Sequence, residues 1–299
     1  MNVRHFLTLN DLSRAELLEI IKRAIEMKEA LKQGKIEASR QGKILAMIFE
    51  KSSTRTRVSF ETAIVQLGGH GIFMSPDDSQ LGRGEPLEDT ARVLSKMVDC
   101  VMIRTFEHEK LMTYSKHSEI PVINGLSDSY HPCQVLADMQ TFFEIKGDVR
   151  GKTVAWLGDG NNMCHSYINA ARILDFTLKI ACPESHKPNA QLLDEASSFV
   201  EVTQDPELAV KDADLVVTDV WASMGQEQES EQRAKIFNTY QVNSEIMSLA
   251  ANKAIFMHCL PAHRGEEVTA EVIDGPQSVV WEEAGNRLHS QKALLEFLL

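Results

Sequence analysis

The sequence KILAMIFEKSSTRTR (residues 43–57) opens with an apolar run at residues 43–49 and continues into hydroxyl and guanidinium side chains. Residues 58–67 then carry the pattern of a helix, which Gly68 and Gly69 end. A short apolar run followed by a helix is typical of a strand in a parallel sheet that is buried on both faces. This stretch therefore predicts a strand–helix unit with polar residues where the strand ends.

The same alternation of short apolar runs and helical stretches continues along the chain in two series. Further runs occupy residues 71–74, 100–103 and 121–123 in the first series, and residues 153–157, 178–181, 215–220, 254–257 and 279–281 in the second. A break at residues 145–151 separates the series, after a predicted helix at about residues 133–145 with Pro132 in its first turn. An earlier helix starts with a capping box of Ser13 and Glu16. The sequence therefore predicts an α/β fold of two three-layer α/β lobes, each with a central parallel sheet.

The composition is that of a packed globular protein with an excess of acidic residues. The chain has 299 residues, and because one domain usually has ~100–200 residues, two domains are expected. The formal charge of -12 disfavours nucleic acid or an anionic membrane as a partner. No apolar run approaches the ~20 residues that cross a bilayer, and residues 1–10 lack a signal pattern. Five cysteines without CxxC spacing indicate reduced thiols, so we expect a soluble cytoplasmic protein.

Polar, reactive residues follow nearly every predicted strand. They are Arg104 and HPCQ (residues 131–134) in the first series, and GDGNN (residues 158–162), Asp219, HCLP (residues 258–261) and Arg287 in the second. In open α/β sheets, ligands bind beyond the carboxyl ends of the strands. We therefore expect these residues to face one active site, in the cleft between the two lobes.

The segment STRTR (residues 53–57) has the features of a phosphate site. A helix N-terminus presents backbone N–H groups and the positive end of the helix dipole to an anion. Ser53, Thr54 and Thr56 add hydroxyl donors, and Arg55 adds a planar fork that matches a phosphate group. The alternative is an N-capped surface helix with solvated arginines. This alternative is less favoured because the segment has two arginines interleaved with three hydroxyls.

Four motifs together resemble the aspartate/ornithine carbamoyltransferase family. They are STRTR (residues 53–57), HPCQ (residues 131–134), DVWASMG (residues 219–225) and HCLP (residues 258–261), in the family's order and spread over nearly the whole chain. The first motif is shared with the aspartate enzymes and indicates only the donor, carbamoyl phosphate. The Ser-Met-Gly and His-Cys-Leu-Pro segments are those of the ornithine enzymes. The resemblance implies transfer of a carbamoyl group to the side-chain amine of L-ornithine, giving L-citrulline and phosphate in arginine metabolism, with biosynthesis as the expected direction.

The resemblance also implies a role for individual residues. The carbamoyl phosphate site would consist of Ser53, Thr54, Arg55, Thr56, Gln80, Arg104, His131, Gln134, Cys259, Leu260 and Arg287. Ornithine would be bound by Asn162, Asp219, Ser223 and Met224, and the catalytic residues would be Cys259, Asp219, Arg104 and His131. Gly285 departs from the family pattern, because an acidic residue is expected there.

The chemistry of the reaction agrees with these roles. A primary amine with a pKa near ~10.4 is almost wholly protonated at neutral pH, and an ammonium cannot attack a carbonyl. Asp219 and a Cys259 thiolate are suited to favour or accept loss of the proton. Donors at Thr56, Arg104 and His131 would stabilise the charge that builds on the carbamoyl oxygen. The reaction requires no metal or organic cofactor.

Domain boundaries and assembly follow from the same resemblance. Residues 1–146 would form the carbamoyl phosphate-binding domain and residues 147–285 the ornithine-binding domain, with a C-terminal helix at residues 286–299 packing back on the first. Family members form trimers, so a homotrimer or a multiple of trimers is expected. Gln80, in the loop at residues 79–85, would reach a neighbouring subunit's site, and the alternative for this loop is an exposed glycine-rich turn.

Other functions remain as alternatives. Gly158-Asp-Gly160 partly matches a dinucleotide fingerprint, but Met163 stands in place of the third glycine. His258, Cys259 and His263 suggest zinc, yet no second ligand pair has the usual spacing. Another acceptor, such as aspartate, putrescine or an acylated ornithine, would make the chain a different carbamoyltransferase. A non-catalytic subunit with the same fold is disfavoured because the reactive residues are present.

Overall fold

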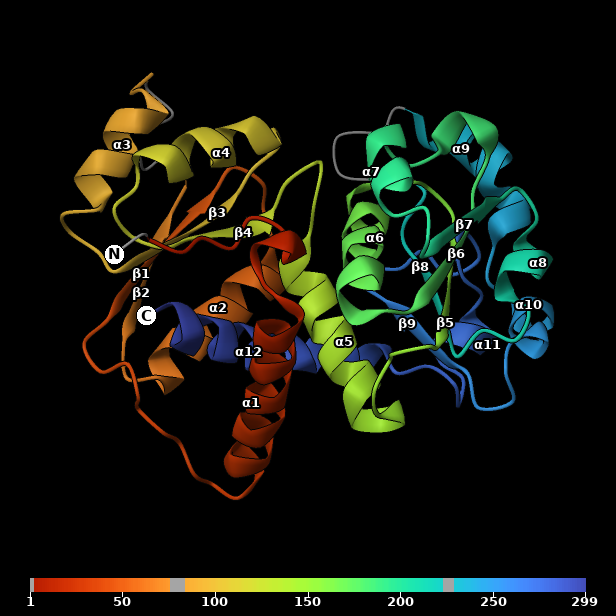
Figure 1. Ribbon diagram of the computed structural model, residues 1–299, viewed down its shortest axis with the longest axis horizontal. Helices are drawn as coiled ribbons and strands as arrows, with labels where there is room; N and C mark the ends of the chain where they lie inside the picture. Colours follow the sequence, from red (N-terminus) through yellow and green to blue (C-terminus); the bar gives the residue numbers. More distant parts are fainter. Residues whose placement is uncertain (1–2, 76–83, 223–228) are drawn as a thin grey trace. The chain divides into compact units, whose positions relative to one another are not determined.

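The computed structural model describes residues 3–75, 84–222 and 229–299. The chain forms two compact units (Figure 1). The first unit consists of Met1–Glu144 and Gly285–Leu299, and the second unit is Ile145–Ala284. Within the described residues, no helix is both long enough and apolar enough to span a membrane.

The first unit contains a parallel sheet with the strand order β2-β1-β3-β4. Its strands are β1 (Ile44–Phe49), β2 (His70–Met74), β3 (Cys100–Arg104) and β4 (Val122–Leu126). Strand β1 pairs with both β2 and β3, and its end, Phe49, lies opposite Arg104, the end of β3. The carboxyl ends of these strands therefore share one edge of the sheet.

Helices cover both faces of this first sheet (Figure 1). They are α1 (Arg14–Lys32), α2 (Thr54–Gln66), α3 (Leu87–Leu94), α4 (His108–His117) and the residues of α5 (Pro132–Lys146) and α12 (Val280–Leu298) that belong to this unit; a short 3-10 helix, η1 (Leu9–Asp11), precedes α1. On the α3 and α4 side, Leu111 and Tyr114 pack in a buried cluster with Ile48 and Val101. Burial on both faces explains why the central strands β1 and β3 are almost continuously apolar.

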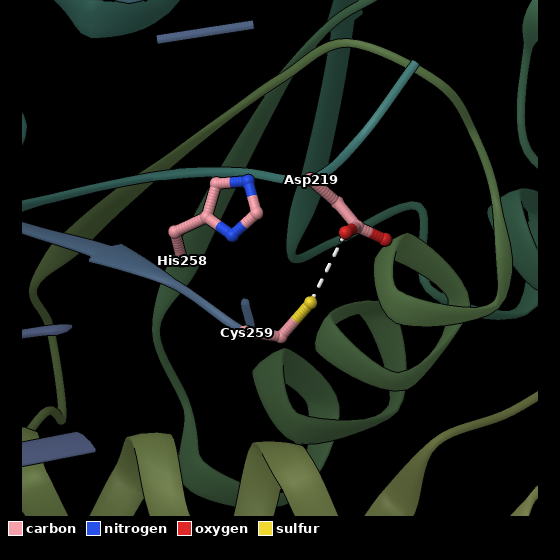
Figure 2. A group of neighbouring side chains, drawn as sticks. All are labelled: Asp219, His258 and Cys259. Carbon is pink, nitrogen blue, oxygen red and sulfur yellow. Dashed lines mark hydrogen bonds between the residues drawn. The ribbon is translucent and has the colours of Figure 1, made fainter. Parts of the chain in front are cut away.

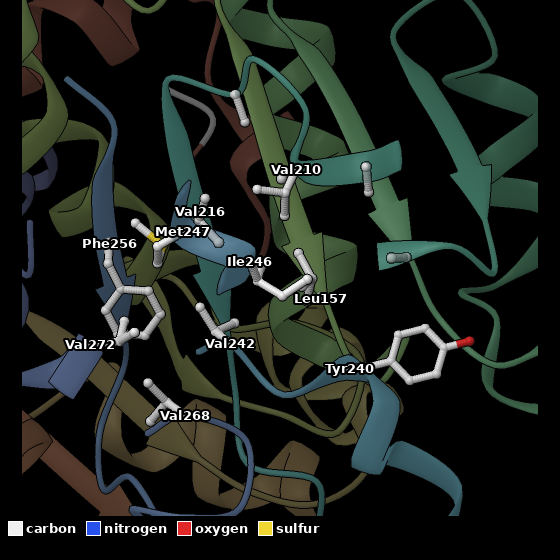
Figure 3. Packing of buried hydrophobic residues seen from close by; sticks show 14 of the residues in the cluster. Leu157, Val210, Val216, Tyr240, Val242, Ile246, Met247, Phe256, Val268 and Val272 are labelled. Atoms are coloured by element: carbon white, nitrogen blue, oxygen red, sulfur yellow. The ribbon is translucent and has the colours of Figure 1, made fainter. Parts of the chain in front are cut away.

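The second unit contains a five-stranded parallel sheet with the order β7-β6-β5-β8-β9. Its strands are β5 (Thr153–Leu157), β6 (Thr177–Ala181), β7 (Val200–Thr203), β8 (Leu215–Thr218) and β9 (Ile255–His258). Its helices are α6 (Asn162–Leu174), α7 (Ala190–Glu195), α8 (Pro206–Val210), α9 (Ser230–Phe237), α10 (Ser244–Leu249) and α11 (Ala270–Ile273), with short 3-10 helices η4 (Glu184–His186) and η6 (Asn238–Tyr240). A buried cluster that includes Leu157, Val216, Met247, Phe256 and Val272 joins the sheet to α8, α10 and α11 (Figure 3).

The predicted fold class is confirmed, and most differences concern the ends of elements. The capping box of Ser13 and Glu16 starts helix α1, and Pro132 begins α5 as expected. Helix α2 begins at Thr54 rather than at residue 58, so the STRTR segment forms its first turn instead of preceding it.

Two strand predictions were wrong. Residues 279–281 are not a strand, because Val280 begins the long helix α12, although Ser278 still forms an isolated bridge with Phe256. Strand β7 was missed, because it lies at the sheet edge with exposed or half-buried residues and therefore lacks an apolar run.

Candidate functional site

The first turn of helix α2 has the geometry of an anion site. Ser53 is the N-cap, and its hydroxyl oxygen accepts a hydrogen bond from the Thr56 backbone N–H at 3.2 Å. Thr54 and Arg55 are exposed at the helix start, whereas Thr56 is buried. The predicted phosphate-binding residues therefore share one helix terminus, where N–H groups and the helix dipole favour an anion.

Arg287 of helix α12 connects two of the predicted donor-site residues. Its Nη1 donates to Gln134 Oε1 at 2.6 Å, and its Nη2 donates to Thr56 Oγ1 at 3.1 Å. All three side chains are buried. The guanidinium fork thus fixes the start of α2 relative to the start of α5, and Arg287 lies on a helix, as the predicted C-terminal helix at residues 286–299 implied.

His131 lies immediately before α5, in a strongly positive environment. Burial and the charges of Arg287, Arg104 and Arg55 hold the pKa of the imidazole well below its usual value. His131 is therefore neutral near pH 7 and can donate one hydrogen bond without carrying a charge. Arg104 is itself buried at the end of β3, so the structure brings the predicted residues 55, 104, 131 and 287 together.

In the second unit, Asp219 and Cys259 are in direct contact. The Cys259 thiol donates to Asp219 Oδ1 with a sulfur–oxygen distance of 3.0 Å (Figure 2). The Val220 backbone N–H donates to the same carboxylate oxygen at 2.8 Å, and Asn161 Nδ2 donates to Oδ2 at 2.8 Å. The buried carboxylate of Asp219 thus has three hydrogen-bond donors, and its burial does not by itself require a cation.

The HCLP segment is held by a group of buried polar contacts. His258 Nδ1 accepts from the Leu260 backbone N–H at 2.9 Å, and His258 Nε2 lies 3.1 Å from Glu267 Oε1. Glu283 Oε2 accepts from the His258 backbone N–H at 2.9 Å. Leu260 has a φ of 55°, in the left-handed region that non-glycine residues rarely adopt, so these contacts hold a strained backbone beside Cys259.

A metal in this part of the second unit is not favoured by the geometry. Ligand atoms of Asp219, His258 and Cys259 lie within 4.8 Å of one another, which is close enough to share an ion. Both ring nitrogens of His258 already have partners, however, in Leu260 and Glu267. The histidine would have to give up one of these contacts before it could bind zinc.

Several residues that surround Asp219 and Cys259 in the second unit were not predicted from the sequence. Asn161, not only the predicted Asn162, contributes: its side chain caps α6 and also contacts Asp219, whereas Asn162 begins the helix. The signal was an asparagine at an N-cap position, a strongly preferred residue there. Glu267 and Glu283 had no sequence signal beyond their type. The predicted residues Gln80, Ser223 and Met224 lie outside the described residues.

Comparison with known proteins assigns both halves of the chain to one family. The carbamoyl-P binding domain of "Aspartate/ornithine carbamoyltransferase" matches residues 4–144, and its Asp/Orn binding domain matches residues 150–298. The "Ornithine carbamoyltransferase" of Nitrosococcus oceani is 62% identical over 299 residues, which cover 100% of this chain and 98% of that protein. The "Ornithine carbamoyltransferase, anabolic" of Pseudomonas aeruginosa is 56% identical, with the same coverage.

Solved structures give the same result. The ornithine carbamoyltransferase of Burkholderia thailandensis has a TM-score of 0.93 and 54% identity, and covers 99% of both chains. That of Pyrococcus furiosus has a TM-score of 0.94 and 49% identity, and covers 98% of this chain and 96% of the other. The likeness therefore extends over the full length of both units.

Proposed function

The chain belongs to the aspartate/ornithine carbamoyltransferase family, and on that basis we propose that it is an ornithine carbamoyltransferase. It transfers the carbamoyl group of carbamoyl phosphate to the side-chain amine of L-ornithine, releasing L-citrulline and phosphate. The observation that carries the choice of acceptor is the buried Asp219 carboxylate beside the Cys259 thiol, 3.0 Å from it. A carboxylate attracts a cationic amine and repels an acidic acceptor.

The donor is bound by the residues around the start of α2. Ser53, Thr54, Arg55 and Thr56 hold the phosphate, because a helix N-terminus with a guanidinium matches its charge. Arg104 and neutral His131 donate to the carbamoyl oxygen, and Gln134 receives the carbamoyl amino group. Cys259, Leu260, Arg287 and Gln80 complete the donor site. One donor to a developing oxyanion typically lowers the barrier by about 2.7–4 kcal/mol.

The acceptor is bound by residues of the second unit. Asp219 balances the charge of the ornithine side chain, and Asn162, Ser223 and Met224 hold its α-carboxylate and α-amino groups. The amine loses a proton before attack; its nitrogen then forms a bond to the carbamoyl carbon while the bond from that carbon to the phosphate oxygen breaks. Cys259 donates to Asp219, and the two side chains together are placed to accept the proton that the amine loses.

A citrulline assay with ornithine, putrescine and aspartate, run side by side, tests the proposal. Citrulline from ornithine, with little carbamoylation of the other two amines, is the expected result. Putrescine lacks the α-carboxylate, and aspartate would bring a negative charge towards Asp219. Preference for either of them would overturn the choice of acceptor, and no product with any amine would overturn the activity itself.

We further propose a cytoplasmic homotrimer, or a multiple of trimers, in arginine biosynthesis. Residues 1–146 serve as the donor domain, with the helix at 286–299, and residues 147–285 as the ornithine domain. The support for a trimer is membership of the carbamoyltransferase family, whose members form trimers. Light scattering should give a mass of a multiple of three chains of 33.5 kDa, and a monomer at working concentration would contradict assembly.

A further inference from the structure

Asp138 is a fully buried carboxyl group that the reaction described above does not use. It lies on helix α5, one turn beyond Gln134, and the spacing of four residues places both side chains on one helix face. Gln134 Nε2 donates to Asp138 Oδ1 at 2.9 Å. The side chain of Asp138 therefore contacts a donor-site residue rather than solvent.

The amide of Gln134 is held from both of its ends. Its Nε2 donates to Asp138, while its Oε1 accepts from Arg287 Nη1 at 2.6 Å. The nitrogen and oxygen of an amide have nearly the same shape, so packing alone does not choose between its two orientations. A guanidinium only donates, and Asp138 Oδ1 is the acceptor for the amide nitrogen. Only one orientation satisfies both neighbours, with the carbonyl oxygen at Arg287 and the NH₂ at Asp138.

We propose that Asp138 is a positioning residue that makes the donor site select a carbamoyl group over an acetyl group. It does so by fixing, together with Arg287, the orientation of the Gln134 amide. The proposal rests on the proposed function, in which Gln134 receives the carbamoyl amino group. A carbonyl oxygen can accept two hydrogen bonds, so Oε1 can serve Arg287 and the carbamoyl NH₂ together.

Acetyl phosphate is the relevant competitor, because it has the same shape and charge as carbamoyl phosphate with a methyl group in place of NH₂. The methyl group cannot donate to Gln134 Oε1, so the fixed amide favours the carbamoyl compound. In the opposite orientation, the amide NH₂ would face both Arg287 and the carbamoyl NH₂, and donor would meet donor. A site built around a hydrogen bond discriminates strongly against an analogue that cannot make it.

Helix α5 contains a matched control for this pair. Gln140 Nε2 donates to Glu144 Oε1 at 2.8 Å, again over four residues and again between an amide and a carboxylate. Both residues also contact Asn286, and Glu144 pairs with Lys28, but neither contacts Gln134 or Arg287 through a hydrogen bond that the structure describes. Glu144→Gln should therefore affect the stability of the helix without affecting the choice of donor.

The test compares the dissociation constants of carbamoyl phosphate, acetyl phosphate and inorganic phosphate, measured by calorimetry on the full-length protein. Asp138→Asn is nearly isosteric, but the new amide can also turn its NH₂ towards Gln134, so that only Arg287 still favours one orientation of the Gln134 amide. We expect it to lower the preference for carbamoyl over acetyl phosphate about tenfold, the size of one hydrogen bond, with phosphate affinity within about twofold of wild type. The Glu144→Gln variant should keep the wild-type preference.

A second variant exchanges the two groups. Gln134→Glu alone would place two carboxyl groups side by side in the interior and should lose donor affinity. In Gln134→Glu/Asp138→Asn, the amide introduced at position 138 can donate to the carboxylate introduced at position 134, which again offers an acceptor to the carbamoyl NH₂. The double variant should therefore regain a preference for carbamoyl phosphate. If Asp138→Asn alone does not fold, the proposal is tested with the double variant.

An unchanged preference in Asp138→Asn, or an equal loss of affinity for all three ligands, would overturn the proposal and leave Asp138 with a structural role. The proposal would also be overturned if the double variant preferred carbamoyl over acetyl phosphate no more strongly than Gln134→Glu does. Failure of the proposed function has a different signature, since the wild type itself would then show no preference for carbamoyl phosphate and make no citrulline.

Discussion

The Cys259 thiol lies 3.0 Å from the Asp219 carboxylate because two parallel strands end side by side. Strands β8 and β9 are paired so that Thr218 lies opposite His258. Asp219 follows the end of β8 and Cys259 follows the end of β9, so both side chains lie at the same edge of the sheet. A one-residue change in the pairing would separate them, so the register of the sheet positions this pair.

Asp219→Asn should impair the acceptor step and leave the donor step intact. In the proposed function, the change removes the charge that would balance the ornithine amine but keeps the shape of the side chain. Turnover with ornithine should fall and the pH dependence of kcat/KM should change, while the dissociation constant of carbamoyl phosphate stays nearly the same. Donor titration by calorimetry and a pH–rate profile measure the two effects. Lost donor affinity, or normal ornithine kinetics across the pH range, would mean that Asp219 is structural.

Cys259→Ser should slow turnover with a smaller effect on donor affinity. A serine hydroxyl can still donate to Asp219 but does not ionise near neutral pH, whereas an ordinary thiol has a pKa near ~8.5. A drop in kcat with the contact preserved would indicate that ionisation of the thiol matters. Cys133→Ser is a suitable control, because that buried thiol donates to the Asn124 backbone oxygen rather than to a site residue. Equal effects of both changes would point to packing instead of chemistry.

Arg55→Lys should weaken carbamoyl phosphate binding while the fold stays intact. Lysine keeps the positive charge but loses the planar fork, so it cannot pair with a phosphate through two parallel hydrogen bonds. A hydrogen bond to a charged group is worth about 1.5–3 kcal/mol, so kcat/KM should fall roughly ten- to a hundredfold. Steady-state kinetics at fixed ornithine check this, with Arg57→Lys as the control because Arg57 contacts Glu61 and the Phe73 ring. Unchanged kinetics would remove Arg55 from the site.

The strand ends of the site could be predicted from sequence, whereas its long-range contacts could not. Parallel strands have their carboxyl ends at one sheet edge, so the grouping of Asp219 with Cys259 follows from two apolar runs and the residues after them. Arg287 is different. Its contacts to Thr56 and Gln134 join residues 231 and 153 positions apart. They depend on how helix α12 packs, which no local pattern encodes.

Errors in the sequence-based fold had physical causes as well. Residues 279–281 are β-branched and aromatic, so they look like a strand, but tertiary packing makes Val280 the start of a helix. Strand β7 was missed for the opposite reason, since its alternating apolar and polar residues suit an exposed edge and do not form an apolar run. The role proposed for Asp138 could not be predicted from the sequence, because it depends on the orientation of the neighbouring Gln134 amide.

His131 should remain neutral across the range in which an ordinary histidine titrates. Burial, followed by the charges of Arg287, Arg104 and Arg55, lowers its pKa well below the usual value of 6.5. Because the folded protein resists this proton and the unfolded chain accepts it near pH 6.5, the stability contributed by neutral His131 is present above that pH and is lost as the pH falls below it. Nitrogen chemical shifts of the imidazole, followed by NMR from pH 8 to about 5.5, should stay at values of the neutral ring. Arg287→Met removes the arginine whose charge lowers the pKa of His131 most, and should therefore raise that pKa. A wild-type titration near 6.5, or no change in the variant, would show that His131 is not held neutral by this arginine-rich surrounding.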